Sequence, residues 1–443
     1  MKSILSIYDQ ILNDEGSTYI TKAISWLHII RPGNPGYLKN YSIDLRNDIS
    51  NFIKLKKFLK RNLNFLVYLF KKNVFYSKNA NKINKNDILI ISHCPIKKAS
   101  NSRRDFIFGQ LPLIFKKKKL SHFKLLLNHT NYDSEFLNQN NNIKNQIILE
   151  KYLSFFDEIK LFTLQLKEFL RLKKIELSTK NEKKKICLKK ISLSLFDSQT
   201  KFSLRMYILT TKYIDKIKPK YLIFTYEGFA WERLCIKAAR KYNQNMVLIG
   251  YQHALISKEN YAMLRNIKGN YNPDIIWASG KHSFNIFKKS KKLKKIKIKN
   301  IGYLKKIKIY KKNKTIKPNC LVVPSATYSE NIKLFNFSLQ CLKKNKLVKF
   351  TWRAHPQIDM NNVIKNLNLH NKRIPNNIKI SKKALRSDII KNSFVLYRDT
   401  SAVVEAISGG NYPIYLNFKN EPNIDSIYDI KTIQNISVLL INF

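Results

Sequence analysis

Short apolar runs alternate with amphipathic segments over most of the chain beyond residue 86, which predicts strands alternating with helices. The first such run is Asp87–Ser92, and a polar loop, His93–Asp105, follows it. A helix is predicted over Phe106–Lys118, and a second strand, Phe123–Asn128, completes a β-α-β unit. Continuous apolar strands in such a unit are typical of a parallel sheet that is covered on both faces.

The middle of the chain is predicted to be a loop and then mainly helix. The Asn-rich segment Asn128–Asn145 has the composition of a loop, and the pattern is helical over Gln146–Ile217. Alternation resumes after Pro219. The elements predicted there are the strands Tyr221–Thr225, Met246–Gly250, Asp274–Ala278 and Ile296–Ile301 and the helix Phe229–Tyr242.

A second run of alternation follows a basic stretch, Lys305–Lys317, which ends at Pro318 and is predicted to be a linker. Its predicted strands are Leu321–Val323, Leu347–Trp352, Phe394–Tyr397 and Pro413–Leu416, and its predicted helices are Ser329–Lys344, Lys382–Asn392 and Ser401–Ser408. The chain is therefore predicted to be an α/β protein with two Rossmann-like domains facing a cleft. The predicted parts are a helical N-terminal extension (1–85), a first domain (86–304), a linker (305–318) and a second domain (319–443).

Composition is compatible with a hydrophobic core in each domain, and it bears on which partners the chain is expected to bind. A chain of 443 residues with 44% hydrophobic residues can bury a core in each domain. The formal net charge is +54, but Lys is spread over the whole chain with Asn and Ile, as AT-rich codon usage produces, and Arg is scarce. A nucleic-acid binder should gather its charge on one face and interleave Arg or aromatic residues. We therefore expect no nucleic-acid partner, whereas an anionic inner-membrane surface remains compatible with this charge.

Cysteine usage and hydropathy favour a cytoplasmic protein that is peripheral at the inner membrane. Five scattered cysteines without a Cys-x-x-Cys pair are typical of reduced thiols. Met1–Gly16 has no sustained apolar run, which predicts no signal peptide. Leu63–Phe70 is far shorter than the roughly 20 residues of a membrane span. With lysines on both sides, it is predicted to be a buried helix or, alternatively, a helix on a membrane surface.

Two polar clusters in the second domain follow predicted strands, where open α/β sheets bind their ligands. Thr400 and Ser401 come between a strand and a helix, where free N–H groups favour an anion, and Glu405 lies one turn further on and can accept from ribose hydroxyls. Ordinary helix capping is the alternative for the hydroxyls. Arg353, His355 and Pro356 follow the strand Leu347–Trp352. Together the two clusters predict a phosphate site.

Polar residues also follow strands of the first domain. Glu227 and Gly228 come directly after the strand Tyr221–Thr225, and His253 follows the next strand. They predict a shared catalytic site, with Glu227 simply favouring the start of its helix and His253 satisfied in its loop as the alternatives. Arg103 and Arg104 lie in the loop after the first strand and are predicted to meet an acidic acceptor, or to form a solvated charge pair.

The sequence motifs of several enzyme and metal-binding classes are absent. The sequence contains no Asp-x-Asp, no Gly-x-x-x-x-Gly-Lys-Ser/Thr, no Gly-x-Ser-x-Gly, and no Cys/His set with zinc spacing. We therefore expect neither a metal site nor a bound cofactor.

The ordered set Glu227-Gly228, His355-Pro356 and Thr400-Ser401 resembles bacterial transferases that use CMP-activated sugars, namely polysialyltransferases, related sialyltransferases and capsule β-Kdo transferases. The resemblance implies a GT-B fold, inverting transfer without a metal, Glu227 as general base, and His355, Thr400 and Ser401 on the donor phosphate. The strings YEGFAWERL, IGYQHA and FGQLP also resemble surface-carbohydrate biosynthesis proteins. The late pair is Thr-Ser rather than Ser-Ser, and Tyr226 stands where a second carboxylate can occur.

The sequence thus predicts a glycosyltransferase that moves a sugar from a nucleotide donor, CMP-linked by resemblance, to a lipid-linked or growing surface glycan. The nearest alternative is a glycerophosphotransferase with a CDP-glycerol-type donor, in which His355 serves the chemistry itself. A nonenzymatic basic membrane-associated protein is the alternative from a different class.

Overall fold

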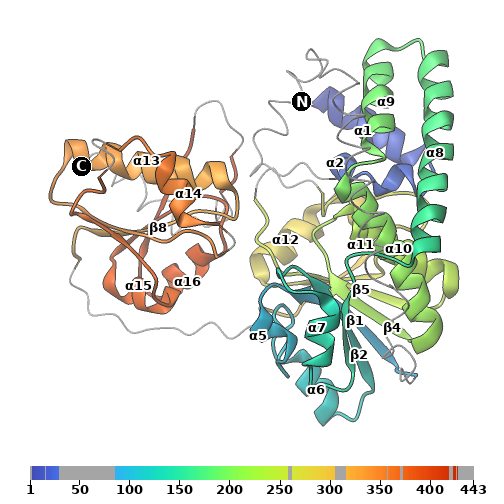
Figure 1. The fold of residues 1–443 in the computed structure, drawn as a ribbon, viewed down its shortest axis with the longest axis horizontal. Coiled ribbons are helices and arrows are strands. Elements are labelled where there is room, and N and C mark those ends of the chain that lie inside the picture. Colours follow the sequence, from blue (N-terminus) through green and yellow to red (C-terminus); the bar gives the residue numbers. More distant parts are fainter. Residues whose placement is uncertain are drawn as a thin grey trace. The chain divides into compact units, whose positions relative to one another are not determined.

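The chain forms two compact units, each built on its own parallel sheet (Figure 1). The structure is a computed structural model that describes residues 2–14, 16–28, 85–257, 262–304, 316–356, 358–369, 373–418, 423–425 and 427. Unit 1 comprises Met1–Ile30, Ser42–His253 and Tyr261–Lys305, and unit 2 comprises Arg31–Tyr41, Ala254–Asn260 and Lys306–Phe443.

Unit 1 contains a seven-stranded sheet in the order β3-β2-β1-β4-β5-β6-β7, with all neighbours parallel. The strands are β1 (Ile88–Cys94), β2 (His122–Asn128), β3 (Gln146–Leu149), β4 (Tyr221–Thr225), β5 (Val247–Gln252), β6 (Ile275–Ala278) and β7 (Lys297–Asn300). The chain moves outward from β1 to β3, returns to the other side of β1 as β4, and continues outward to β7. This order makes the sheet Rossmann-like.

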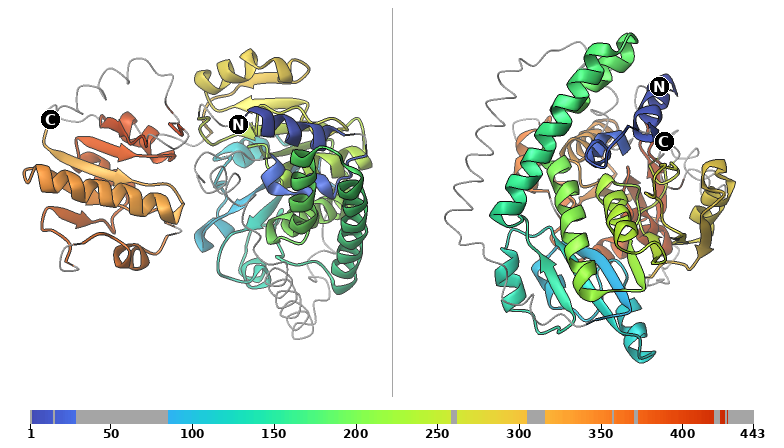
Figure 2. Two further views of the ribbon diagram at one scale, coloured as in Figure 1. Left: turned by 90° about the horizontal axis from the view of Figure 1, so that it is seen from above. Right: turned by 90° about the vertical axis from the view of Figure 1, so that its right-hand side faces the viewer.

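Helices pack on both faces of this sheet (Figures 1 and 2). They are α5 (Lys97–Ser100), α6 (Leu111–Lys117), α7 (Ser134–Gln139), α8 (Phe155–Ser178), α9 (Glu182–Ser194), α10 (Ser198–Ile217), α11 (Ala230–Tyr242), α12 (Lys281–Lys289) and the 3₁₀ turn η3 (Lys291–Leu293). Helices α8 and α9 run side by side, and α10 packs on α11. One hydrophobic core of the unit joins β1, β4 and β5 to α6 and the turn before it, and it includes Ile90, Phe108, Ile223 and Tyr251.

The first described residues also belong to unit 1. They form α1 (Lys2–Asn13), η1 (Thr21–Ala23) and α2 (Ser25–His28). Buried Arg265 ties them to the loop between β5 and β6, because its Nε donates to Asp9 Oδ1 at 2.8 Å and its Nη1 to the carbonyl of His28 at 3.2 Å.

Unit 2 contains a five-stranded parallel sheet in the order β10-β9-β8-β11-β12. The strands are β8 (Asn319–Val323), β9 (Lys349–Trp352), β10 (Ile378–Ile380), β11 (Phe394–Tyr397) and β12 (Tyr412–Tyr415), and the helices are α13 (Tyr328–Lys344), α14 (Met360–Lys365), α15 (Leu385–Lys391) and α16 (Ala402–Ser408). Trp352 stacks on Phe335 at 4.7 Å between ring centroids and donates Nε1–H to Ser338 Oγ at 2.8 Å. The strand order is again that of a Rossmann-like sheet.

The predicted fold class is confirmed in its two parallel Rossmann-like sheets, and the strands Tyr221–Thr225 and Phe394–Tyr397 have their predicted bounds. The predicted helix Phe106–Lys118 is wrong in its first part, because the Asp105 carboxylate accepts the N–H groups of Ile107 and Phe108 and closes a turn before α6. Pro112 also fits only the first turn of a helix.

Two further predictions around Asn128–Ile217 are wrong. Helix α7 lies inside the expected loop, where the Asn138 side chain pairs with the backbone of Ile148 in both directions. Gln146–Leu149 is an edge strand rather than the start of a helix, because its apolar side chains are buried against the sheet. Residues 305–315 of the expected linker and the apolar stretch Leu63–Phe70 lie outside the described residues.

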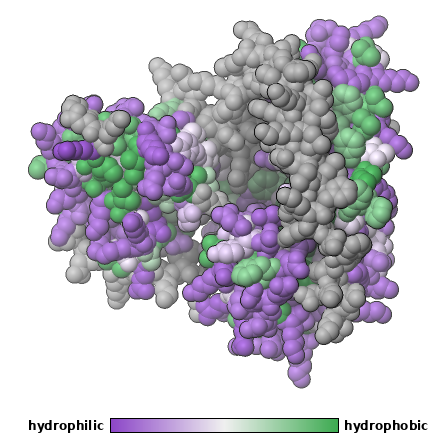
Figure 3. All heavy atoms as spheres, viewed as in Figure 1, coloured by the Kyte–Doolittle hydropathy of each residue, from purple (hydrophilic) through white to green (hydrophobic). Residues whose placement is uncertain are grey.

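Figure 3 shows a mostly hydrophilic surface with smaller apolar areas over the part of the chain that is coloured in that view. No helix among the described residues is long and apolar enough to cross a membrane.

A buried ion pair fixes the end of β11 in unit 2. Arg398 Nη1 lies 3.1 Å from both carboxylate oxygens of Glu330 on α13, and both side chains are fully buried. Removing one partner of such a pair leaves the other charge buried without compensation.

We therefore expect Glu330→Ala to lower the free energy of unfolding by about 3–5 kcal/mol, measured by chemical denaturation. Lys333→Gln is the matched control, because Lys333 makes a partly exposed ion pair with the same carboxylate at 3.5 Å, and its loss should cost under about 1 kcal/mol. Equal effects of the two changes would show that the buried pair does not stabilise unit 2.

Candidate functional site

The sheet of unit 1 reverses its direction of growth between β1 and β4, and open α/β sheets bind ligands at the carboxyl ends of the strands beside such a switch point. His93 lies near the end of β1, and Thr225 ends β4. His129 and His253 directly follow the outer neighbours β2 and β5. Four adjacent strands therefore place polar groups at one edge of the sheet.

Glu227 is held by the loop between β4 and α11. The backbone N–H groups of Glu227 and Phe229 donate to Glu232 Oε2 at 2.8 and 2.9 Å. Gly228 between them has φ +81°, and a Cβ there would lie 2.4 Å from the backbone of Ala262. Only glycine fits that position without a shift of the chain. The loop thus has one compact conformation, with Glu227 at its turn.

The Glu227 carboxylate pairs with His253. Glu227 Oε1 lies 3.2 Å from His253 Nε2, and the two side chains are 8% and 23% exposed. Gly250 allows the strands beneath them to pack closely, since a Cβ there would lie 2.7 Å from Cβ of Tyr226. The structure thus brings the two predicted catalytic residues together.

His93 and His129 form a second polar pair beside the first. His93 Nδ1 lies 2.7 Å from His129 Nε2, and His93 Nε2 lies 3.1 Å from Thr225 Oγ1. The His93 ring is 6.3 Å from the ring of His253 and meets Trp231 edge-on at 5.7 Å. A histidine–histidine hydrogen bond needs one ring nitrogen without a proton, so the pair is not doubly charged.

These imidazoles are neutral in the folded chain near pH 7. Burial, helped by the neighbouring His129 and His253, holds the pKa of His93 well below its usual 6.5. Burial and Lys151 also lower the pKa of His129. A neutral imidazole donates through one nitrogen and accepts through the other. The cluster is therefore suited to hydroxyl groups rather than to an anion.

Sequence reasoning did not single out His129, and it gave no role to Glu232. His129 follows the strand β2 as directly as His253 follows β5, so its position after a strand was the available signal. Glu232 is fully buried, and burial together with the nearby Glu227 raises its pKa well above the usual 4.5. Its carboxyl group is therefore a protonated internal support for the loop of Glu227.

The predicted acceptor residues Arg103 and Arg104 are exposed in the loop after β1. Asp105 beside them is buried and accepts from Ser92 Oγ at 2.7 Å, so it is part of the loop's framework. The two guanidinium groups remain on the surface of this loop, where they can meet an acidic ligand.

In unit 2 the loop after β9 carries Arg353, His355 and Pro356. Arg353 Nη1 donates to Asp388 Oδ2 at 3.0 Å, so part of its guanidinium group is already engaged. His355 is half-buried, Pro356 is exposed, and burial lowers the pKa of His355 below its usual 6.5. The histidine is thus held close to the sheet rather than in open solvent.

The loop after β11 carries the other predicted phosphate residues. Thr400 Oγ1 accepts the N–H of Ala402 at 3.3 Å, whereas Ser401 and Glu405 are exposed, and Ser401 makes no side-chain capping bond. Strand β8 separates β9 from β11. The two clusters therefore share one sheet edge, on the order of 10 Å apart, rather than lying on neighbouring strands.

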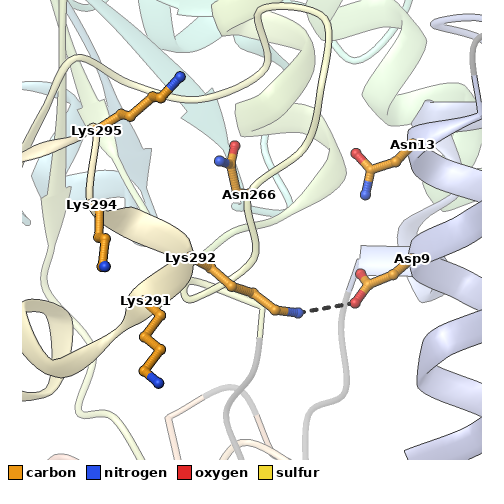
Figure 4. A pocket seen from close by; sticks show the side chains of 7 residues that line it. All are labelled: Asp9, Asn13, Asn266, Lys291, Lys292, Lys294 and Lys295. Atoms are coloured by element: carbon orange, nitrogen blue, oxygen red, sulfur yellow. Dashed lines mark hydrogen bonds and ion pairs between the residues drawn. The ribbon is translucent and has the colours of Figure 1, made fainter.

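A basic pocket of about 530 Å³ opens elsewhere on unit 1, between α1 and the turn that precedes β7 (Figure 4). It is lined by Asp9, Asn13, Asn266, Lys291, Lys292, Lys294 and Lys295. Its acceptors are already used: Asp9 by Lys292 at 3.1 Å and by Arg265, Asn13 Oδ1 by a backbone N–H, and Asn266 Oδ1 by Asn272. Ammonium and amide N–H donors remain, and this lining is complementary to an anion.

Within the described ranges, no group of three or more His, Cys, Asp or Glu side chains can hold a metal ion.

No protein-family model and no curated protein matches the sequence. Solved structures match at low identity. UDP-GlcNAc 2-epimerase from Neisseria meningitidis bound to UDP-GlcNAc is 12% identical, with 80% of this chain and 90% of that chain covered and a TM-score of 0.43. The S. aureus MnaA–UDP structure is 14% identical, with 81% and 86% covered and a TM-score of 0.42. CalG4, the calicheamicin glycosyltransferase, is 11% identical, with 75% and 80% covered and a TM-score of 0.41. Similarity at this level says nothing of activity, and the fold class rests on the strand orders of the two sheets.

The protonated Glu232 carboxyl predicts a pH dependence of stability. In the unfolded chain this group ionises near 4.5, whereas in the folded chain its pKa is raised, so folding takes up a proton above that pH. The free energy of unfolding contributed by this group therefore falls as pH rises. We expect Glu232→Gln, which keeps the oxygen acceptor, to gain stability relative to the native chain as the pH rises above about 4.5.

Denaturant unfolding at several pH values measures this difference. Glu232→Ala is the control, and it should lose about 1–3 kcal/mol because two backbone N–H groups lose their acceptor. Parallel stability curves for the native chain and the Gln variant would mean that Glu232 is ionised in the folded state.

Proposed function

We propose that this protein is an inverting glycosyltransferase that moves a sugar from a nucleotide donor to a hydroxyl of a lipid-linked or growing surface glycan. The observation that carries the proposal is the pairing of Glu227 with His253 at the switch point of unit 1, beside the neutral His93–His129 pair. A carboxylate set among neutral hydrogen-bonding groups can receive a hydroxyl and take its proton.

In the proposed reaction the acceptor hydroxyl loses its proton to Glu227 as its oxygen attacks the anomeric carbon. The bond between that carbon and the donor phosphate oxygen breaks, and its electron pair leaves with the nucleotide. His253 contacts Oε1 of Glu227 and helps to orient the carboxylate that takes the proton. The buried Glu232 accepts the backbone N–H of Glu227 and so holds the base in place. A base that is already in position needs little movement during the reaction.

The donor is proposed to bind at the carboxyl edge of unit 2. Arg353, His355 and the hydroxyls of Thr400 and Ser401 supply donors for its phosphate, and the exposed Glu405 can accept from ribose hydroxyls. Charge on the leaving phosphate would be neutralised by these groups, without a metal ion or a bound cofactor. The resemblance of the His-Pro and Thr-Ser motifs supports a CMP-linked sugar.

The acceptor is proposed to bind at unit 1, with Arg103 and Arg104 meeting an acidic group such as a lipid-linked phosphate. The formal net charge of +54 supports a location at the cytoplasmic face of an anionic inner membrane.

One observation favours the related phosphoglycerol transfer. Burial lowers the pKa of His355, and a neutral imidazole is the form that accepts a proton during chemistry, whereas a phosphate ligand gains from being charged. Product analysis separates the two reactions, since one product carries a glycosidic bond and the other a phosphodiester.

The proposed donor site predicts which nucleotide stabilises the chain. Because a ligand that binds only the folded state raises the melting temperature, a thermal-shift panel of CMP, CDP, UDP, GDP and ADP should show its largest increase with a cytidine nucleotide. UDP belongs in the panel because two of the similar structures contain UDP or UDP-GlcNAc. His355→Ala should weaken that binding about tenfold or more, through loss of a charge-assisted contact of about 1.5–3 kcal/mol.

His122→Ala is the matched control, because His122 starts β2 in unit 1. Stabilisation by UDP or GDP but not by CMP or CDP would contradict the choice of donor. An unchanged affinity in His355→Ala would make that histidine structural.

The proposed base predicts a loss of turnover without a loss of binding. Glu227→Gln keeps the shape of the loop and removes the basicity, so turnover should fall by roughly a hundredfold or more relative to the native chain. Both chains are assayed in excess EDTA. Nucleotide affinity and melting temperature should stay near those of the native chain, as they should in the control Glu182→Gln at the exposed start of α9.

An active Gln variant would place the base elsewhere, with His253 the next candidate. Abolition of the native activity by EDTA, with recovery on adding Mg²⁺ or Mn²⁺, would contradict the metal-independent mechanism. A chain that turns over no nucleotide sugar but still binds anionic vesicles would support the nonenzymatic alternative.

A further inference from the structure

Helix α8 buries several charged and polar side chains and exposes bulky apolar ones, unlike an ordinary surface helix. Surface helices normally turn an apolar stripe toward the core and polar residues toward solvent. The inward face of α8 buries Leu161 and Leu172, but it also buries four polar side chains, all at most 8% exposed: Glu158, Gln165, Glu168 and Glu176. Figure 2 shows the helix along its whole length.

The inward polar groups are paired, which explains why this face is stable against unit 1. Glu158 accepts from Arg205 Nε at 2.6 Å and from Arg205 Nη2 at 3.1 Å. Glu168 accepts from Arg171 Nε at 2.8 Å and from Thr18 Oγ1 at 2.6 Å. The remaining acids of α8 are also in ion pairs, Asp157 with Lys212 and Glu176 with Lys173. Each acid of this helix thus has a cationic partner, and none of the four is among its exposed residues.

The outward face carries a stripe of bulky apolar side chains. They are Phe156 (80% exposed), Ile159 (45%), Phe162 (37%), Leu166 (43%), Leu170 (61%) and Leu177 (79%). Their spacings of three, four or seven residues keep them on one side of a helix of 24 residues, which is about 36 Å long. An apolar surface of this length is uncommon on a protein that stays in water, and it marks an interaction surface.

Lysines lie beside this stripe along the same helix. Lys160, Lys167 and Lys174 are exposed and are separated by seven residues, which is nearly two helical turns. The other exposed residues of α8 are Thr163 and Ser178. The outward face is therefore apolar and positively charged.

We propose that the outward face of α8 lies in the headgroup region of an anionic phospholipid bilayer, with the helix parallel to the membrane surface. The apolar stripe would reach the boundary of the acyl chains, and the lysine stems would extend from it to place their ammonium groups among the lipid phosphates. The site binds a lipid surface and needs no sugar donor, so it stands apart from the transfer reaction.

Charge favours a lipid surface over a second copy of the chain. A twofold contact through the stripes of two copies would bring the same lysines together, and the exposed residues of α8 include no carboxylate to offset them. Like charges facing each other across a helix pair are destabilising. An anionic bilayer supplies the opposite charge to every lysine of the face.

Vesicle flotation of the full chain tests the proposal. We expect binding to vesicles of phosphatidylglycerol and phosphatidylcholine, and much weaker binding to phosphatidylcholine alone. The triple change Leu166→Ser, Leu170→Ser, Leu177→Ser should reduce the partition coefficient about tenfold or more, because it removes three of the six apolar side chains. The matched control Leu120→Ser, Leu347→Ser, Ile390→Ser removes three exposed apolar side chains from other elements and should bind as the native chain does. Melting temperatures of both variants check that the fold is kept.

A second pair of variants tests the lysines. Lys160→Gln, Lys167→Gln, Lys174→Gln should weaken vesicle binding and its dependence on salt. Lys116→Gln, Lys117→Gln, Lys118→Gln removes the same charge from exposed positions at the C-terminal end of α6 and should have little effect. Equal losses in both lysine variants would overturn the proposal, because binding would then follow net charge alone. A dimer in sedimentation that becomes a monomer in the leucine variant, without vesicle binding by either, would also overturn it and identify a second copy as the occupant.

Discussion

The candidate site of unit 1 depends on one buried carboxyl group. Glu232 accepts the backbone N–H groups of Glu227 and Phe229, and this closes the loop between β4 and α11 around Gly228, which lies against the backbone of Ala262. A charged Glu232 would be costly in this fully buried position, so burial raises its pKa and keeps the group protonated. The loop in turn places the Glu227 carboxylate beside His253. The contact between these two side chains therefore depends on the hydrogen bonds that Glu232 accepts from the loop.

The two units present different chemistry at corresponding sheet edges. Unit 1 gathers neutral imidazoles and one carboxylate, a set suited to hydroxyl groups and their protons. Unit 2 offers an arginine bonded to Asp388, a histidine and two hydroxyls, which are groups that can donate hydrogen bonds. A reaction that takes a proton from a hydroxyl in one place and leaves charge on a phosphate in another needs both sets.

Much of the fold followed from local pattern, and the exceptions have physical reasons. Tyr221–Thr225 and Phe394–Tyr397 are central strands, and buried parallel strands appear as continuous apolar runs. The edge strand Gln146–Leu149 is as short as Phe394–Tyr397, but it comes just before a long helical region. Periodicity alone could not distinguish it from the start of a helix. Glu227 and His253 were predictable as strand ends, but His129 joins them only because β2 lies next to β1. The polar inward face of α8 is not visible in sequence, because Glu158 pairs with Arg205 from another helix. The cap from Glu232 is local, and its only signal is a Glu three residues after Phe229 at the start of α11.

The stereochemistry of transfer tests the central claim most directly. Direct attack by an acceptor hydroxyl activated by Glu227 inverts the anomeric centre, so NMR of the product formed from a nucleotide sugar of known configuration should show the opposite anomer. A product with the configuration of the donor would contradict the account, because retention requires a covalent intermediate or attack from the face of the leaving group rather than a single displacement assisted by this carboxylate.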